Sequence, residues 1–409
     1  MNPRLIQSRR AFRTGLALAC LSACASEPPG PADRAPVITI SGIQDGTVVT
    51  GPVTITIEVD IGTYLATLNG ETFVSGRTVS GPDDYVLSVT ARHGDATAAA
   101  TVAFTIALSG DTRLIIRVFD LGPNEAGGGG DAILLTDSSH AGLRHVLVDA
   151  GPAGPAGGDP GFVARRLATL GVDTLEALVL SHAHGDHFDG MTAVLNQVVV
   201  LRFVYNGQVR NFGPYTGLVT LATSQAGTVV VPATPTPLTV GFGGTASVLT
   251  LLPPLGTYLA NANATSSEIN EGSLGAELAK GPFRMFLAGD GEVQANLRWR
   301  NTFASRTADV SVLKVGHHGA NDAVFDNGFS GTSAWLQHAA PMVAVISANG
   351  GSHPRQNAIA ALLGLPAAIT YCTHVHGDLE IRVGEHGDYQ VTPERNPDAG
   401  CVAGTDGTP

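Results

Sequence analysis

The sequence predicts a small all-β unit followed by a larger, layered α/β unit. Two observations support this prediction. Short runs that alternate apolar and polar residues extend from Val37 to Leu108, and apolar strand-like runs alternate with helix-like segments from Asp111 onward. Hydrophobic residues make up 44% and charged residues 14% of the 409-residue chain, which is typical of a globular protein with more than one domain.

The first residues predict an export signal rather than part of a domain. A basic stretch, RLIQSRRAFR, precedes an apolar run that is too short to cross a bilayer. The run ends in Leu-Ser-Ala-Cys, which resembles a bacterial lipobox and implies cleavage before Cys24 and lipidation there. Cys20 is a weaker candidate, and an ordinary secretory signal is the alternative. We expect a signal peptide over residues 1–23 and a Pro-rich tether over 24–36, on a chain held at the bacterial cell envelope by lipid alone.

Residues 37–108 predict the all-β unit. The runs VITISG, VTITIEVD, DYVLSVTARH and ATVAFTIAL are separated by Asp-Gly, Asn-Gly and Gly-Pro turns. This pattern predicts a small antiparallel β-sandwich. Its architecture resembles bacterial immunoglobulin-like modules.

Residues 111–393 predict the α/β unit, and residues 394–409 a polar tail. LIIRVFD, DAILLTD and HVLVDAG predict strands, GFVARRLATLG a helix, and LEALVLS a buried strand. SLGAELAKGPFRMFLAGD predicts a hairpin, and DVSVLKVGHHG and MVAVISANG predict strands with helices between them. The final segment, AITYCTHVHGDLEIRVGEHGDYQVT, predicts a strand meander.

The stretch SHAHGDHFDG, directly after the buried strand LEALVLS, predicts a metal site. If the chain is extended there, the rings of His182 and His184 point to the same side, and Asp186 and His187 follow in the turn before a helix. Imidazoles and a carboxylate suit zinc, or iron or manganese if oxygen ligands are added. A polar loop with incidental histidines is the alternative, and it does not explain so dense a cluster.

Further candidate ligands follow three other predicted strands. Asp290 ends FRMFLAGD, where a carboxylate can bridge two metals, although a Gly-Asp-Gly turn is the alternative. His317 and His318 lie in LKVGHHGA, and we expect one to bind metal and the other to contact the ligands or the substrate. His353 lies in SANGGSHP, where a plain loop histidine is the alternative. If these strands run the same way, their ends converge on one edge.

The succession VFDLG, GDAILL, VLVDAG, LVLSHAHGDH, FLAGD, LKVGHHGA and ISANGGSHP resembles the metallo-β-lactamase fold. In particular, it resembles the hydrolase domain of ComEC-type DNA-uptake proteins, over residues 113–392. The resemblance implies a four-layer αββα fold and one or two Zn²⁺ ions, with Mn²⁺ as the alternative. It implies metal binding by His182, His184, Asp186, His187, Asp290 and either His317 or His318.

The resemblance also implies roles outside the metal ligands. Asp120 matches an aspartate that orients the metal loop. Asn349 and His353 match positions near the scissile phosphate, where His353 would stabilise developing charge. Asp186 or Asp290 would orient the nucleophile.

The sequence departs from the family pattern in three places. No histidine occurs between His187 and His317, and the pattern Asn270-x-x-Ser273 stands in that interval, as it does in ComEC-type relatives. One metal site is therefore short of a ligand. The longer GPNEAGGGGD replaces a tight Gly-Gln-Gly-Asp loop, and no apolar run follows that could form the transmembrane channel of DNA-uptake proteins.

Two further patterns are less specific. Cys372 and Cys401 are expected to form a disulfide after export, and two unpaired thiols are the alternative. The sequence His374-x-His376-x-Asp378 repeats part of the metal motif. It predicts a hairpin turn, with an accessory contact near the metal site as the alternative.

The overall charge narrows the possible functions. The net charge is −12, which argues against tight binding of long nucleic acid by the whole surface. The leading hypothesis is an exported metal-dependent phosphodiesterase or nuclease. The second is a hydrolase of a small ester, lactone or β-lactam at the same site. The third is an envelope protein that binds a partner through the all-β unit and carries a degenerate hydrolase unit.

Overall fold

A computed structural model describes eight stretches of the chain. They are residues 34–79, 82–107, 114–122, 129–139, 142–152, 161–242, 247–366 and 368–405. The expected signal peptide, Cys24 and most of the GPNEAGGGGD insertion lie outside them. No helix among the described residues is both long and apolar enough to cross a membrane.

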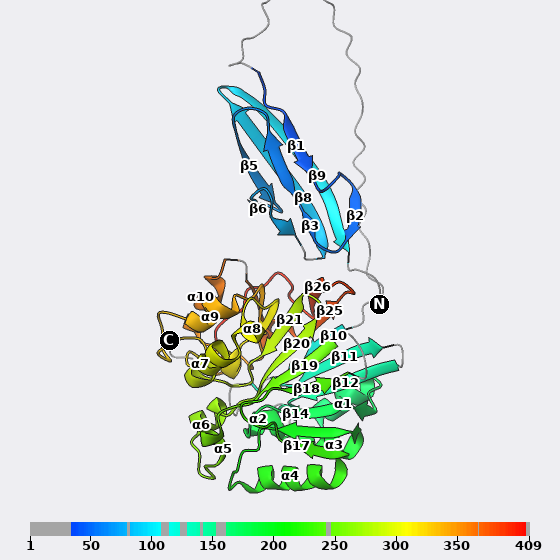
Figure 1. Ribbon diagram of the computed structural model, residues 1–409, viewed down its shortest axis with the longest axis vertical. Helices are drawn as coiled ribbons and strands as arrows, with labels where there is room; N and C mark the ends of the chain where they lie inside the picture. Colours follow the sequence, from blue (N-terminus) through cyan, green and yellow to red (C-terminus); the bar gives the residue numbers. More distant parts are fainter. Residues whose placement is uncertain are drawn as a thin grey trace, which may run out of the picture.

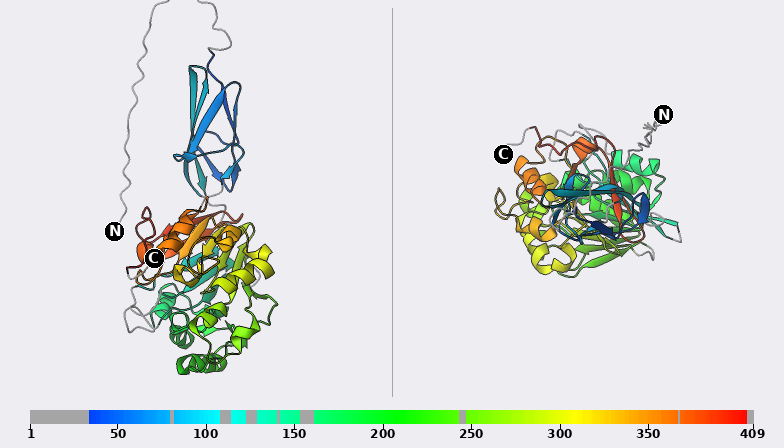
Figure 2. Two further views of the ribbon diagram at one scale, coloured as in Figure 1. Left: turned by 90° about the vertical axis from the view of Figure 1, so that its left-hand side faces the viewer. Right: turned by 90° about the horizontal axis from the view of Figure 1, so that it is seen from above.

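The N-terminal unit is built from strands alone, and Figures 1 and 2 show it beyond one end of the α/β unit. Its strands are β1 (Ile38–Ser41), β2 (Thr47–Thr50), β3 (Val53–Thr54), β4 (Thr56–Val59), β5 (Thr63–Leu68), β6 (Glu71–Thr72), β7 (Thr78–Val79), β8 (Asp83–His93) and β9 (Ala96–Ala107). A sheet of order β2-β9-β8-β5-β6 and the pairs β1-β4 and β3-β7 share one core around Ile55 and Leu87. The expectation of a purely antiparallel unit is wrong, because β2 pairs in parallel with β9. No tight turn joins these two strands, so none fixes their direction.

Two mixed sheets form the centre of the α/β unit (Figure 1). The first has the order β17-β16-β14-β12-β11-β10-β25-β26 and the second β18-β19-β20-β21-β22-β23-β24. The first sheet contains β10 (Leu114–Val118), β11 (Ile133–Ser139), β12 (Gly142–Val148), β14 (Ala177–Leu180), β16 (Arg202–Tyr205), β17 (Thr228–Val230), β25 (Leu379–Val383) and β26 (Tyr389–Pro393). The second contains β18 (Leu238–Gly241), β19 (Ser247–Leu252), β20 (Gly275–Lys280), β21 (Phe283–Leu287), β22 (Val312–Lys314), β23 (Val343–Ile346) and β24 (Ile369–Cys372). A small parallel pair, β13 (Thr174–Leu175) with β15 (Val199–Val200), lies apart from both.

The longer helices cover the outer faces of both sheets, and short helical turns lie in the loops between strands. They are α1 (Phe162–Thr169), α2 (Gly185–Phe188), α3 (Met191–Gln197), α4 (Gly213–Gln225), α5 (Gly256–Leu259), α6 (Ser266–Glu271), α7 (Val293–Thr302), α8 (Ala304–Thr307), α9 (Ala334–Ala339), α10 (Gln356–Leu363) and α11 (Thr373–His376), with a 3₁₀ turn, η1 (Gly316–Gly319).

Three buried clusters define the order of the layers. Residues at alternate positions of both sheets, such as Val148 and Met285, pack together between the sheets. Their strand neighbours point the other way, so that Leu147 packs with α1, α3 and α4, and Phe286 packs with α7, α9 and α10. The layers are therefore helix, sheet, sheet and helix. The expected α/β fold class is confirmed.

The last segment does not form the expected meander. Strand β24 pairs with β23 in the second sheet, whereas β25 pairs with β10 in the first. The single turn α11 lies between them, so the chain crosses from one sheet to the other at this point. His374 and His376 belong to that turn rather than to a hairpin.

Candidate metal centre

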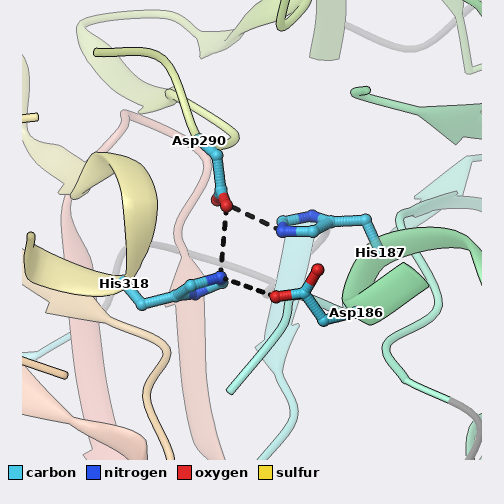
Figure 3. Close-up of side chains that lie close together, drawn as sticks. All are labelled: Asp186, His187, Asp290 and His318. Atoms are coloured by element: carbon cyan, nitrogen blue, oxygen red, sulfur yellow. Dashed lines mark ion pairs between the residues drawn. The ribbon is translucent and has the colours of Figure 1, made fainter. Parts of the chain in front are cut away.

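The metal-capable side chains lie at the carboxyl ends of strands from both sheets. His182 to His187 follow β14 in the first sheet, whereas Asp290 and His318 follow the parallel strands β21 and β22 of the second. The carboxyl ends of parallel strands are where α/β sheets bind ligands. Figure 3 shows side chains from both sheets pointing toward one another.

One group consists of Asp186, His187, Asp290 and His318. Asp290 Oδ1 lies 3.2 Å from His187 Nε2, and its Oδ2 lies 3.3 Å from His318 Nε2. Asp186 Oδ2 also lies 3.3 Å from His318 Nε2 (Figure 3). Two ligands on a tetrahedral zinc ion are about 3.4 Å apart, given zinc–nitrogen bonds of about 2.0–2.1 Å. The side chains are already spaced as ligands of one ion.

A second group shares Asp290 and adds His182 and His184. His182 Nε2 lies 3.1 Å from His184 Nδ1 and 3.7 Å from Asp290 Oδ2. Asp290 thus faces both groups. The second group contains three side chains, one fewer than the first, as the missing histidine of the sequence predicts.

The chemistry of the first group fits a bound cation. His187 Nε2, His318 Nε2 and Asp290 Oδ1 are buried and make no hydrogen bond to any described residue. Buried polar atoms without partners are costly, and most of those in proteins are satisfied. Here three such atoms, each from a different strand end, face one another. A metal ion bound between them would satisfy all three.

Hydrogen bonds on the far side of the rings fix which nitrogen is available. His318 Nδ1 donates to the carbonyl oxygen of Ser347 at 2.9 Å, so its Nε2 keeps the lone pair in the neutral ring. Asp149 Oδ2 accepts from His187 Nδ1 at 2.8 Å, with the same result. Ser181 Oγ donates to Asp149 at 2.7 Å and lies 3.0 Å from His182 Nδ1.

Asp149 is therefore the residue that orients the metal loop, and sequence reasoning missed it. It follows β12, is 1% exposed, and receives hydrogen bonds from Ser181, through both N and Oγ, and from His187. Its backbone φ of 57° is unusual for a residue other than glycine. The available signal was an aspartate that ends the apolar strand HVLVD beside the histidine strand.

The role predicted for Asp120 is wrong. The amide N–H of Asp120 donates to Asp378 Oδ1 at 2.8 Å, and its carboxylate accepts from Arg395 at 2.7 Å. Asp378 also pairs with Arg166. Asp120 therefore ties the end of β10 to the segments beside β25. Asp378 is the acidic residue of the pattern His374-x-His376-x-Asp378. These contacts therefore show that its carboxylate bonds to Asp120 and Arg166 and lies outside the two metal groups.

The rings of His376 and His374 likewise contact backbone carbonyl oxygens and not the metal groups. His376 is fully buried and its Nδ1 lies 2.9 Å from the carbonyl oxygen of Cys372, whereas His374 Nε2 lies 3.1 Å from that of Val402. The other nitrogen of the His376 ring lies 3.0 Å from the carbonyl oxygen of Ala399, so both rings contact the C-terminal part of the chain. Neither ring belongs to the two metal groups.

The two adjacent histidines divide their roles. His318 joins the first metal group, whereas His317 Nδ1 lies 3.0 Å from Asp322 and 3.4 Å from Glu292. Both have positive φ, 43° and 52°, so the chain turns sharply enough to send the rings in different directions. Asn270 donates to Glu292 at 2.7 Å, and Glu292, His317 and Asp322 form a separate candidate group that includes neither Asp290 nor His318.

The remaining candidates surround the metal groups. The His353 ring centre lies 5.3 Å from that of His317 and 6.3 Å from that of His318. Ser273 Oγ accepts from the amide N–H of Asp290 at 3.2 Å. Asn349 Oδ1 accepts from the amide N–H of Gly351 at 2.9 Å and so shapes the loop that carries His353.

The backbone beside the centre leaves little space. A Cβ atom at Gly130, where φ is +85°, would lie 2.1 Å from the carbonyl oxygen of Asp186. Only glycine fits there. The next residue, Asp131, pairs at 2.5 Å with Lys314, which is fully buried at the end of β22. The end of the GPNEAGGGGD insertion thus braces both the metal loop and the strand that leads to His318.

Electrostatics favour a cation at the centre. Burial opposes the charged form of His187, but Asp290, Asp149 and Asp186 outweigh it and raise its pKa well above the usual value. Burial likewise opposes charge on His318, but Asp290, Asp186 and Asp131 raise its pKa to about 9. Several buried carboxylates thus act on two imidazoles. Such uncompensated negative charge is costly unless a cation is present.

Burial prevails at the two histidines on which fewer carboxylates act. It lowers the pKa of His182 well below the usual value, and it lowers that of His184 to about 4. Both rings are therefore neutral near pH 7, which is the form that binds metals.

No protein-family model and no curated protein matches the chain. Solved structures that it resembles include the metallo-beta-lactamase fold protein YhfI from Bacillus subtilis, at 14% identity and a TM-score of 0.41, covering 66% of this chain and 100% of that one. They also include CmlA, a diiron beta-hydroxylase from Streptomyces venezuelae, at 13% identity and a TM-score of 0.39, covering 73% and 69%. Zn(2+)-bound PqqB from Methylobacterium extorquens matches at 14% identity and a TM-score of 0.31, covering 55% and 81%. At these identities and TM-scores the fold assignment rests on the layers described above.

We expect His318→Ala and His317→Ala to differ in metal content. His318→Ala removes a nitrogen that faces Asp186 and Asp290, so the purified variant should lose at least about half of its bound metal. His317→Ala should keep it, because His317 bonds to Asp322 instead. Elemental analysis of both variants measures this. Equal metal loss in the two would contradict the division of roles.

Asp149→Asn should weaken metal binding about 10- to 100-fold, because it disturbs the carboxylate that fixes His187. Asp120→Asn is the matched control and should leave metal affinity unchanged. Competition with a chromogenic chelator gives both affinities. A larger effect from Asp120→Asn would restore the role that the sequence suggested for it.

Proposed function

We propose that the chain is an exported, metal-dependent hydrolase that cleaves phosphodiesters. The observation that supports this most strongly is a set of three buried atoms, from His187, His318 and Asp290, that make no hydrogen bond within the described part of the chain and face one another at the carboxyl ends of strands. A divalent cation held there would lower the pKa of a bound water and polarise a phosphoryl oxygen.

The side chains of the chain divide the remaining work. Asp290 is 2% exposed, so it holds charge inside the protein and does not meet the substrate. The Asp186 side chain is 20% exposed and lies beside His318, which also contacts Asp290. We assign to Asp186 the orientation of the attacking water. Burial raises the pKa of the Asp186 carboxyl, but His187 and His318 outweigh it and hold that pKa far below its usual value, so the carboxylate accepts a hydrogen bond from the water and not its proton.

His353 stabilises the charge that develops on the departing oxygen. Burial, followed by the charges of His318 and His317, lowers its pKa to about 3, so the ring is neutral near pH 7. A neutral imidazole can donate a hydrogen bond without itself losing a proton. Its position beside His317 and His318 places it next to the centre rather than within it.

Positive charge near the centre favours an anionic substrate. The partly exposed Arg210 donates to the carbonyl oxygen of Ala183 inside the metal motif. Its charge acts on His184, and that of Arg355 acts on His353. Two arginines whose charges act on histidines of the site suit a phosphodiester better than a neutral lactone or ester. The resemblance to ComEC-type hydrolase domains points the same way.

The net charge of −12 favours a small substrate over long DNA. An ester, lactone or β-lactam substrate is therefore the alternative. Arg210 discriminates a phosphodiester from a neutral ester or lactone, because only an anionic substrate depends on its charge.

With Zn²⁺ or Mn²⁺ restored, the chain should hydrolyse bis(p-nitrophenyl) phosphate, and chelation should abolish the activity. Asp290→Asn should lower kcat/KM at least about a hundredfold, because it removes a charge shared by both metal groups.

Arg210→Gln should raise KM for the phosphodiester and leave any turnover of a neutral lactone unchanged. Lactone or β-lactam turnover that exceeds phosphodiester turnover would favour the alternative. A metal-loaded chain inactive on every class would contradict the hydrolase proposal.

We further propose that the chain is anchored to the bacterial envelope by lipid at Cys24. The basic stretch, the short apolar run and the lipobox-like Leu-Ser-Ala-Cys support this. The full-length chain should sediment with membranes and should be released by detergent but not by salt, whereas Cys24→Ser should be soluble or retain its signal peptide. Soluble wild-type protein would contradict the anchor, and Cys20→Ser is the control for the weaker candidate.

A further inference from the structure

The C-terminal segment from Gly400 to Thr405, which we call the strap, is joined to the second sheet by a disulfide. Cys401 is bonded to Cys372, whose Cα atom lies 5.4 Å away at the end of β24. Cys372 is fully buried among the residues that pack beneath α9 and α10. The described part of the strap contains no helix or strand, so regular backbone pairing does not hold it. The disulfide is its covalent attachment to the core.

The strap lies against the loop from Asn349 to Pro354, which we call the His353 loop. The amide N–H of Gly404 donates to the carbonyl oxygen of Pro354 at 2.9 Å, and that of Thr405 donates to Gly350 at 2.9 Å. The strap therefore bonds to both ends of the loop. A Cβ atom at residue 404 would lie 2.0 Å from the carbonyl oxygen of Gly351 and 3.0 Å from the amide nitrogen of His353. The contact is close enough to admit only glycine.

The opposite side of the His353 loop rests on the turn that carries the metal ligand. Arg355, which follows the loop, donates its amide N–H to Gly319 at 2.9 Å, and Gly319 follows His318 directly. A Cβ atom at Gly319 would lie 2.8 Å from Cβ of Pro354. The loop is thus held between the strap and the metal centre, and its His353 ring lies beside those of His317 and His318.

We propose that the Cys372–Cys401 disulfide, acting through the strap, positions His353 beside the metal centre, so that the hydrolase reaches full activity only after this bond has formed. The inference rests on the proposed function for its activity readout. The two cysteines are positioning residues, because they act through His353. Loss of the bond leaves the metal ligands in place and removes the covalent restraint on the strap, which then keeps only hydrogen bonds such as that between His374 and Val402. One side of the His353 loop is thereby loosened.

The step is a thiol–disulfide exchange. The two thiols give up two electrons and two protons to the disulfide of an oxidising partner protein, which becomes a dithiol, and an added dithiol reverses the reaction. Thiols stay reduced in a reducing cytosol and are oxidised outside it. A chain made in the cytosol and then exported would therefore gain activity on arrival, which restricts hydrolysis to the compartment where the bond forms.

Three variants test the proposal, each assayed for metal content, kcat/KM on bis(p-nitrophenyl) phosphate, and amide hydrogen exchange of residues 349–355. Cys401→Ser removes the bond, and Gly404→Ala keeps it but pushes the strap off the loop. Both should lose about 10- to 100-fold in kcat/KM with metal content unchanged, and both should exchange faster in the loop. Gly400→Ala is the matched control, because a Cβ atom there meets open space, and it should behave as wild type. Full activity in both Cys401→Ser and Gly404→Ala would overturn the proposal.

A double-mutant cycle separates positioning from general loss of structure. If the strap acts through His353, then Cys401→Ser should cost little further activity in a His353→Ala background. Additive losses would contradict the proposal. Failure of the proposed function is distinguishable: a wild-type chain inactive on phosphodiesters would refute that function, while the exchange rates of the loop would still show whether the disulfide holds it.

Discussion

The carboxylate of Asp290 is the group on which the arrangement of the α/β unit depends. Its Oδ1 faces His187 and its Oδ2 faces His182 and His318, so one buried side chain contacts ligands from both sheets. An anion placed there is unfavourable unless positive charge balances it. A bound cation would meet this need and would link strand ends of the two sheets.

Several strained or crowded backbone positions surround this carboxylate. Asp149, His317 and His318 have positive φ, and Gly130 passes within contact of the metal loop. Such conformations cost free energy, and proteins keep them mainly where function requires the geometry. Here they place the His318 ring in the first metal group, Asp149 behind the His187 ring and Gly130 against the metal loop. The strain therefore supports a functional centre over a polar loop with incidental histidines.

The sequence predicted those parts of the site that are contiguous or that end a strand. His182 to His187 fall in one short stretch, and Asp290 and His318 each follow an apolar run, so periodicity and strand order locate them. Asp149 was missed because its role depends on β12 lying beside β14, a pairing between separate segments. Asp120 was misassigned because it too ends an apolar run, and only the tertiary structure shows that it faces Asp378 and Arg395.

The choice between His317 and His318 shows a second limit of sequence reasoning. The two residues are adjacent and chemically identical. The difference between them is set by the sharp turn that both residues form and by their hydrogen bonds, from His318 to Ser347 and between His317 and Asp322. The same applies to the contact between the strap and the His353 loop. Both depend on backbone geometry that residue spacing does not encode.

Anomalous X-ray scattering from a crystal of the metal-reconstituted chain, recorded on both sides of the metal absorption edge, tests the central claim most directly. The account predicts a peak between His187, Asp290 and His318. A second, weaker peak is expected between His182, His184 and Asp290, where the ligand set is shorter. No peak near Asp290 after reconstitution, or a peak only at Glu292, His317 and Asp322, would contradict the account.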